Sequence, residues 1–134
     1  MIELLDYLRE YKYQFTVATS SNRQRAWGYV KKAGIDHYFG EIICGDMVKK
    51  SKPEPDIFLK AAEVLHVAPE HCMVLEDSPM GITAAFRAGM VPVMIPDLVP
   101  PTKELEDKYW KKLGSLREVP HLLEQIQRGN GEEV

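Results

Sequence analysis

The chain has 134 residues, a length that fits one domain with a core of its own. Hydrophobic residues make up 45% and charged residues 28%, and a net charge of -3 gives no indication of a nucleic-acid partner. No run of about 18 apolar residues predicts a membrane span, and the charged start "MIELLDYLRE" is unlike a signal peptide. Two isolated cysteines in apolar runs indicate a reducing compartment, so we expect the protein in the cytoplasm.

Helical and strand-like segments alternate along the chain. Apolar residues at helical spacing predict a helix over residues 2–11, and a short apolar run predicts a strand over 14–19. The segment 20–34 begins with capping residues and ends on a glycine, which is typical of a helix. The remaining expected elements are a strand at 41–45, a helix at 54–67, a strand at 72–77, a helix at 80–89, a strand at 91–96, and closing helices at 102–110 and 118–128.

This alternation predicts an α/β fold with a Rossmann-like, three-layer arrangement: a parallel sheet with helices on both faces. Residues 1–126 are expected to form one domain, and residues 127–134 a polar C-terminal tail. In such sheets, ligands bind beyond the carboxyl ends of the strands. The polar residues that follow each expected strand are therefore the candidates for a site.

Four groups of residues follow the four expected strands. They are Thr19, Ser20, Ser21 and Asn22; then Gly45, Asp46 and the run "KKSKPEPD"; then Glu76, Asp77 and Ser78; and finally Pro96 and Asp97. Hydroxyl groups, a lysine and paired carboxylates would thus meet at one edge of the sheet. That combination suits a phosphate group together with a divalent cation.

Three stretches of the chain, in this order, are similar to motifs of one known family: "FTVATSSN", "KKSKPEPDIF" and "VLEDSPMGITAAFRAGM". They resemble the haloacid dehalogenase (HAD) superfamily of phosphatases and phosphomutases, especially the group around beta-phosphoglucomutase and related sugar-phosphate phosphatases. The last two patterns are long and specific, and the resemblance covers nearly the whole chain. It implies a HAD-like core domain.

The resemblance implies a phosphate site and two catalytic residues. Thr19 would bind the transferring phosphoryl group, and Lys52 would pair with the phosphoryl oxygens and with nearby carboxylates as charge develops. Ser20, Ser21 and Asn22 either add phosphate contacts or only cap the following helix. The alternative for Lys52 is a solvated lysine in a basic run.

The same resemblance implies a metal site at the adjacent carboxylates Glu76 and Asp77, which repel each other unless something positive lies against them. Asp77 would be a direct ligand of Mg²⁺, and Glu76 a nearby or water-bridged one. The alternative is a capping pair, since Asp77 and Ser78 precede an expected helix.

The family's first motif, an Asp-x-Asp pair on a leading strand, has no counterpart here, because the sequence contains no D-x-D. The helical cap that follows it in the family is also absent from the sequence. The resemblance therefore implies that the nucleophile lies outside this chain, and that the sheet lacks its first, central strand.

The residues and the resemblance together give three alternative hypotheses for the function. The first is a Mg²⁺-dependent phosphatase or phosphomutase of small phosphorylated metabolites such as sugar phosphates, working through an aspartyl-phosphate. The second is a catalytically inactive HAD-like module that binds a partner or forms a homodimer through exposed sheet edges. The third, a receiver- or flavodoxin-like domain, predicts acidic residues on the first strand, and "FTVATSS" has none.

Overall fold

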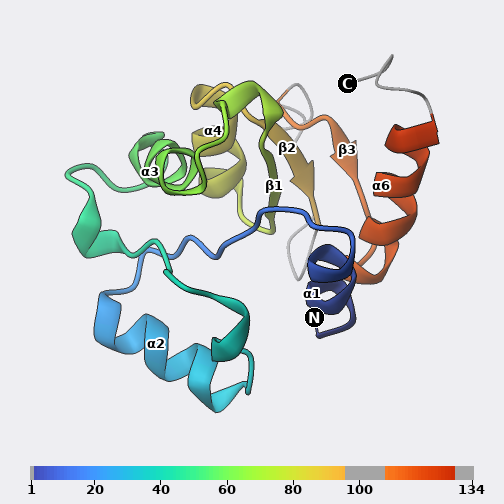
Figure 1. Ribbon diagram of the computed structural model, residues 1–134. Helices are drawn as coiled ribbons and strands as arrows, with labels where there is room; N and C mark the ends of the chain where they lie inside the picture. The colour runs from blue at the N-terminus through green and yellow to red at the C-terminus, as the bar shows by residue number, and fades with distance from the viewer. Residues whose placement is uncertain (1, 96–107, 129–134) are drawn as a thin grey trace.

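The computed structural model describes residues 2–95 and 108–128 (Figure 1). Its sheet has three parallel strands in the order β1-β2-β3: Met73–Glu76, Val91–Met94 and Lys111–Lys112. β1 and β2 pair in register from Met73 opposite Val91 to Glu76 opposite Met94. The two residues of β3 lie beside Val93 and Met94.

Helices cover both faces of this sheet (Figure 1). On one face, α3 (Asp56–Leu65) and α4 (Pro79–Arg87) share a core cluster with Val74 of β1. On the other, α1 (Ile2–Glu10) and α6 (Val119–Arg128) form a cluster against Met73 and Leu75. Neighbouring residues of β1 therefore face opposite layers, as alternation along a strand requires. The expected three-layer, parallel α/β architecture is confirmed.

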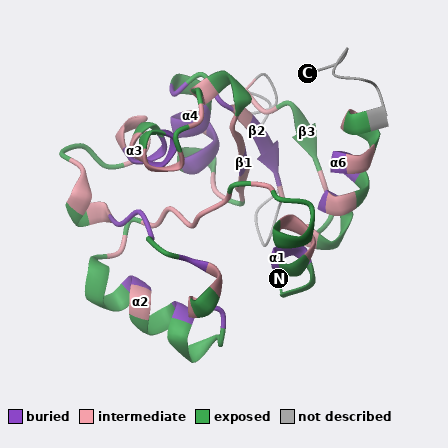
Figure 2. Cartoon of the chain, in the orientation of Figure 1, coloured by how far each residue is buried: buried purple, intermediate pink, exposed green. Residues whose placement is uncertain are grey.

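The sequence explains where the central helices begin. Ser78 precedes α4 and its hydroxyl oxygen accepts a hydrogen bond from the Gly81 N–H at 3.0 Å, while Pro79 occupies the first helical position. α2 (Arg23–Lys32) is capped in the same way, with Asn22 Oδ1 accepting from the Arg25 N–H at 2.9 Å. α2 lies at the lower left in Figure 2 and is largely exposed, whereas buried residues gather on α3, α4 and β2.

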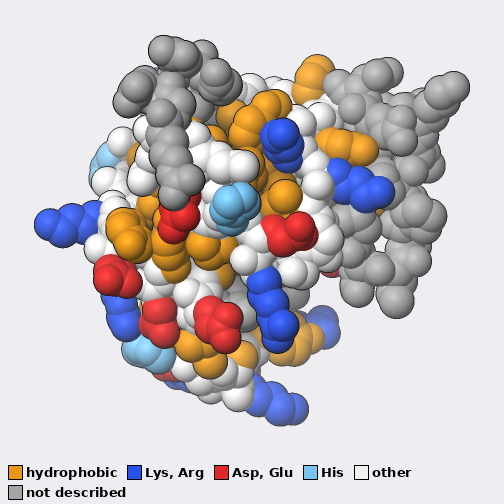
Figure 3. Space-filling model, turned by 90° about the vertical axis from the view of Figure 1, so that its right-hand side faces the viewer, with side chains coloured by type: hydrophobic (Ala, Val, Ile, Leu, Met, Phe, Trp, Pro, Cys, Tyr) orange, Lys and Arg blue, Asp and Glu red, His pale blue; other side chains and the backbone are white. Residues whose placement is uncertain are grey.

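Short 3₁₀ turns link the longer elements. They cover Asp36–Tyr38, Gly45–Met47, Pro69–His71 and Leu116–Glu118. Within the described residues, no helix is both long and apolar enough to cross a membrane. Acidic and basic side chains are interspersed on the face that Figure 3 presents.

The prediction of regular strands at 14–19 and 41–45 is wrong. The structure reduces them to one isolated parallel bridge between Ala18 and Ile43. The Ile43 N–H donates to the Val17 carbonyl and the Thr19 N–H donates to the Ile43 carbonyl, both at 2.9 Å. A strand is stabilised by its neighbours, and this pair of segments has only a single residue of overlap.

The C-terminal part differs from expectation in two ways. Residues 102–107 of one expected helix, together with Pro96 and Asp97, lie outside the described residues, and 108–110 are not helical. The two-residue strand β3 was not expected there. α6 ends at Arg128, where the expected closing helix ends, and Gln127 Nε2 donates to the Tyr13 hydroxyl at 2.6 Å.

A large cavity separates the two parts of the expected sheet. Its volume is about 1430 Å³, and residues 14–18 line it together with residues 72–77. Apolar side chains of the helices, Leu5 and Phe58 among them, also contribute to its wall. We call this cavity the central groove. The segment 14–18 and β1 therefore do not pair directly within the described structure: β1 is an edge strand of its sheet.

Candidate functional site

The best-defined polar contact of the candidate site joins the loop before α3 to the end of β1. Lys52 Nζ lies 3.1 Å from Glu76 Oε2, and the two side chains are only 14% and 12% exposed. The residues are 24 positions apart in the sequence. The Lys52 side chain is therefore largely buried and paired, and not solvated. A charge-assisted hydrogen bond of this kind is stronger than one between neutral groups.

The other oxygen of Glu76 is held by the first backbone groups after β1. Glu76 Oε1 accepts hydrogen bonds from the Asp77 N–H at 3.1 Å, the Ser78 N–H at 3.2 Å and the Ser78 hydroxyl at 3.1 Å. Burial favours the protonated acid and raises its pKa, but the Lys52 charge and these hydrogen bonds outweigh burial, so the pKa of Glu76 is lowered. Glu76 is therefore an ionised carboxylate at neutral pH.

Thr19 lies at the end of the bridged segment. Its N–H is bonded to Ile43, and its hydroxyl oxygen accepts a hydrogen bond from the Ser21 N–H at 3.2 Å. The Gly45 N–H donates to the Ser21 carbonyl at 2.8 Å, and a Cβ on Gly45 would overlap the Ser20 carbonyl. The absence of a side chain at Gly45 thus allows the loop at 19–21 and the loop at 44–46 to touch.

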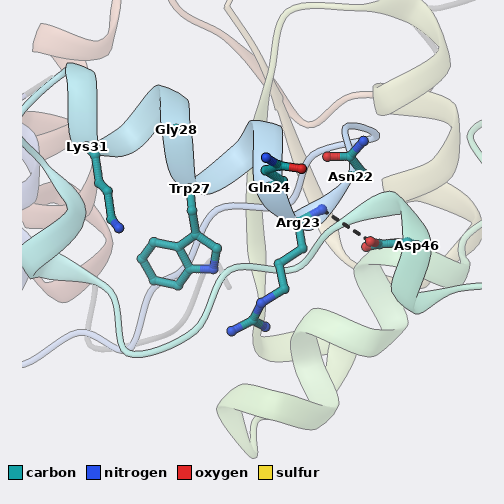
Figure 4. Close-up of a pocket in the computed structure, with 7 residues that line it drawn as sticks. All are labelled: Asn22, Arg23, Gln24, Trp27, Gly28, Lys31 and Asp46. Atoms are coloured by element: carbon teal, nitrogen blue, oxygen red, sulfur yellow. Dashed lines mark hydrogen bonds between the residues drawn. The ribbon is translucent and has the colours of Figure 1, made fainter.

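The structure assigns the capping role that was open among the residues after Thr19. Asn22 caps α2, and the Arg23 N–H also donates to Asp46 Oδ2 at 3.2 Å (Figure 4). Sequence reasoning had no role for Asp46, because the donor to its carboxylate, the Arg23 N–H, lies 23 residues away in the chain. Ser20 is exposed and Ser21 is half-buried.

The two carboxylates expected at the metal site lie side by side in the chain and both line the central groove. In the part of the chain that the structure describes, no group of three or more His, Cys, Asp or Glu side chains could hold a metal ion. Two carboxylates suit a hard cation such as Mg²⁺, which also uses water and substrate oxygens. Glu76 and Asp77 therefore fit part of a Mg²⁺ site whose other ligands must come from elsewhere.

A second cavity, of about 900 Å³, lies along α2 (Figure 4). Its lining includes Arg23, Trp27, Lys31 and Asp46. The indole Nε1 of Trp27 is buried without a hydrogen-bond partner among the described residues, so a molecule in the cavity cannot reach it without movement. The ring packs against the cluster that includes Val30, as expected of a packing residue. This cavity contains none of the residues expected to be catalytic.

The cysteines are packing residues. Cys44 is fully buried and belongs to a core cluster, while Cys72 is half-buried beside another. Burial raises the pKa of both thiols, which disfavours the reactive thiolate.

Comparison with known proteins bears directly on this site. Residues 1–95 match the haloacid dehalogenase-like hydrolase family. A phosphorylated carbohydrates phosphatase of Thermotoga maritima is 35% identical over 88 residues, which are 66% of this chain and 41% of that protein. The fructose-1-phosphate phosphatase YqaB of Escherichia coli is 42% identical over 74 residues, or 55% of this chain and 39% of that protein.

Solved structures of haloacid dehalogenase-like proteins are similar to this chain. A HAD family hydrolase from Deinococcus radiodurans with bound phosphate and sodium superposes with a TM-score of 0.81 and 30% identity, over 95% of this chain and 58% of that one. Beta-phosphoglucomutase from Clostridium difficile superposes with a TM-score of 0.76 and 26% sequence identity, over 95% of this chain and 55% of that one. This chain spans less than half the length of the curated relatives named above. The protein belongs to the haloacid dehalogenase-like hydrolase family.

Proposed function

We propose that this chain is the greater part of the core domain of a Mg²⁺-dependent phosphoryl-transfer hydrolase. Its substrates would be small phosphorylated metabolites such as sugar phosphates, and it would work in the cytoplasm. The observation that carries the proposal is the Lys52–Glu76 ion pair at the carboxyl end of β1, next to Asp77. The phosphatases of Thermotoga maritima and Escherichia coli among its relatives support the substrate class.

Each residue has a defined role in this proposal. Lys52, held by Glu76, would supply positive charge to the transferring phosphoryl oxygens. Thr19, with Ser20 and Ser21 beside it, would donate hydrogen bonds to the same group. Asp77 would be the direct Mg²⁺ ligand, and Glu76 would stand behind it. The cation, when bound, would neutralise phosphate charge.

The covalent nucleophile is proposed to be an aspartate on a strand outside this sequence, and the central groove would receive that strand. The bonds to Ile43 use the carbonyl of Val17 and the N–H of Thr19, so the backbone groups of Ala18 point to the opposite side. Within the described residues, neither Thr16 nor Ala18 has a backbone hydrogen bond. β1 presents its own unpaired edge to the same cavity. An inserted strand would satisfy both edges.

The test compares two proteins on a panel of phosphate esters with Mg²⁺. One is this chain, and the other is the chain extended at its N-terminus through the upstream reading frame. We expect no measurable turnover by the chain alone, and turnover by the extended protein that Lys52→Ala and Asp77→Asn each reduce by orders of magnitude. Robust turnover by the chain alone would contradict the proposed position of the nucleophile.

The second candidate, a binding or dimerising module, is favoured by one observation: the unpaired, partly apolar edge of β1. It predicts a dimer or a domain-swapped form, measured by light scattering over a dilution series. A folded extended protein without activity on the whole panel, together with a concentration-dependent mass, would favour this module over the enzyme. A monodisperse monomer would remove the case for dimerisation.

A further inference from the structure

A glycine in the first turn of α4 has no explanation in backbone conformation. Gly81 is buried inside a helix, and the positive-φ glycines among the described residues are Gly34 and Gly89. A glycine within a helix is less favourable than an alanine. The presence of a glycine at position 81 therefore needs another explanation, and the atoms that surround this position provide it.

The volume that a side chain at Gly81 would need is already filled. A Cβ built there would overlap Cγ, Cδ and Oε2 of Glu76. That oxygen, Oε2, is the one that accepts from Lys52. The other oxygen of the carboxylate is held by groups of Asp77 and Ser78. The Glu76 side chain therefore lies over the start of α4 in a place that only a glycine at position 81 leaves open.

We propose that Gly81 is a positioning residue for Lys52, acting through Glu76. Because position 81 has no side chain, the Glu76 carboxylate can lie against α4 and fix the lysine from the distant loop. Any larger residue at 81 displaces the carboxylate and releases the lysine. The inference rests on the proposed function only for the meaning of Lys52 in catalysis; the contact itself is tested without turnover.

The arrangement also gives the two neighbouring carboxylates, Glu76 and Asp77, different roles. Glu76 already accepts from four donors, counting Lys52, the two backbone N–H groups and the Ser78 hydroxyl. Its charge is directed at the lysine. In the proposed site the direct cation ligand is the next residue, Asp77.

The experiment compares Gly81→Ala with Gly28→Ala, a matched change inside α2 where a Cβ meets nothing within 4 Å. Thermal melting and acetic anhydride labelling of Lys52, read by mass spectrometry, are measured for both. Gly28→Ala should raise the melting temperature slightly and leave the labelling unchanged. Gly81→Ala should lower the melting temperature and raise the labelling rate of Lys52 severalfold, since the lysine loses its buried partner.

A second pair of variants keeps the test decisive even if Gly81→Ala unfolds the protein. Once Glu76→Ala has removed the obstructing side chain, adding Gly81→Ala should stabilise the protein, as Gly28→Ala does, and leave Lys52 labelling unchanged. Destabilisation by Gly81→Ala of the same size with and without Glu76 would overturn the inference. So would equal behaviour of the two single glycine variants. An inactive extended protein would refute the proposed function without affecting this result.

Discussion

Two pairs of segments in this protein have a similar strand-like pattern of apolar residues but form different structures. Short apolar runs contain β1 and β2, whose residues 73–76 and 91–94 are paired over their full length. Residues 14–19 and 41–45 are also short apolar runs, yet they share only the bridge between Ala18 and Ile43. The difference teaches that a strand-like pattern gives a strand only where both a paired edge and a packed face exist.

Hydrogen exchange should show the largest difference between the regions. The amides of Val74 and Val93 lie within the paired strands, and opening them requires most of the global unfolding free energy. The amides of Thr16 and Ala18, without backbone partners among the described residues, should exchange faster by orders of magnitude. Comparable protection at all four amides, measured by NMR, would mean that the two regions are equally ordered in solution.

A matched pair of core substitutions should show a smaller difference. Val93 is fully buried in β2, so Val93→Ala should cost about 2 kcal/mol of unfolding free energy. Val17 is only half-buried, so Val17→Ala should cost less than about 1 kcal/mol. Urea unfolding measures both values. Equal losses would show that the segment 14–18 is packed as firmly as the sheet.

Charge removal at Glu76 tests the link between the loop at Lys52 and the ordered strands. Because the folded pKa of Glu76 lies below its ordinary value of 4.5, its ionised form stabilises the protein above that pH. That contribution is lost as the pH falls through the folded pKa. Glu76→Gln should therefore cost about 1 kcal/mol at pH 7 and progressively less below pH 4.5. A cost independent of pH would indicate a purely steric effect.

Mg²⁺ should have the smallest effect. With Asp77 and Glu76 as the only expected protein ligands in this chain, affinity should be millimolar or poorer. At about ten millimolar Mg²⁺ the melting temperature should rise by no more than corresponds to roughly 1 kcal/mol. Asp77→Asn should abolish the rise. A micromolar site in calorimetry would show that further ligands lie within this chain.

Most of the regular fold was predictable because its signals are local. Helix α4 follows from a capping serine, a proline and an apolar stripe, and β1 and β2 are dense apolar runs between turns. β3 was not predictable, because Lys111 and Lys112 are exposed and give no apolar signal. Only their pairing with β2 makes them a strand.

The candidate site was predictable in composition but not in geometry. The motifs identified Lys52, Glu76 and Asp77 as neighbours of one site. The resemblance implied that the lysine pairs with nearby carboxylates, but which carboxylate oxygen it meets depends on the packed fold, since the contact with Glu76 Oε2 spans 24 residues. The volume at Gly81 is likewise a property of two elements together, and no local pattern reveals it.

The sheet's two outer edges are not equivalent, and β3 is the reason. Its two exposed lysines place positive charge along one border, and bringing a like-charged strand beside them is unfavourable. The opposite border, β1, carries only one ionisable residue, Glu76, and that residue is bonded to Lys52. Extension of the sheet is therefore less favourable at β3 than at β1. An additional strand, native or adventitious, is thus favoured at the border that carries Glu76 and its partner Lys52.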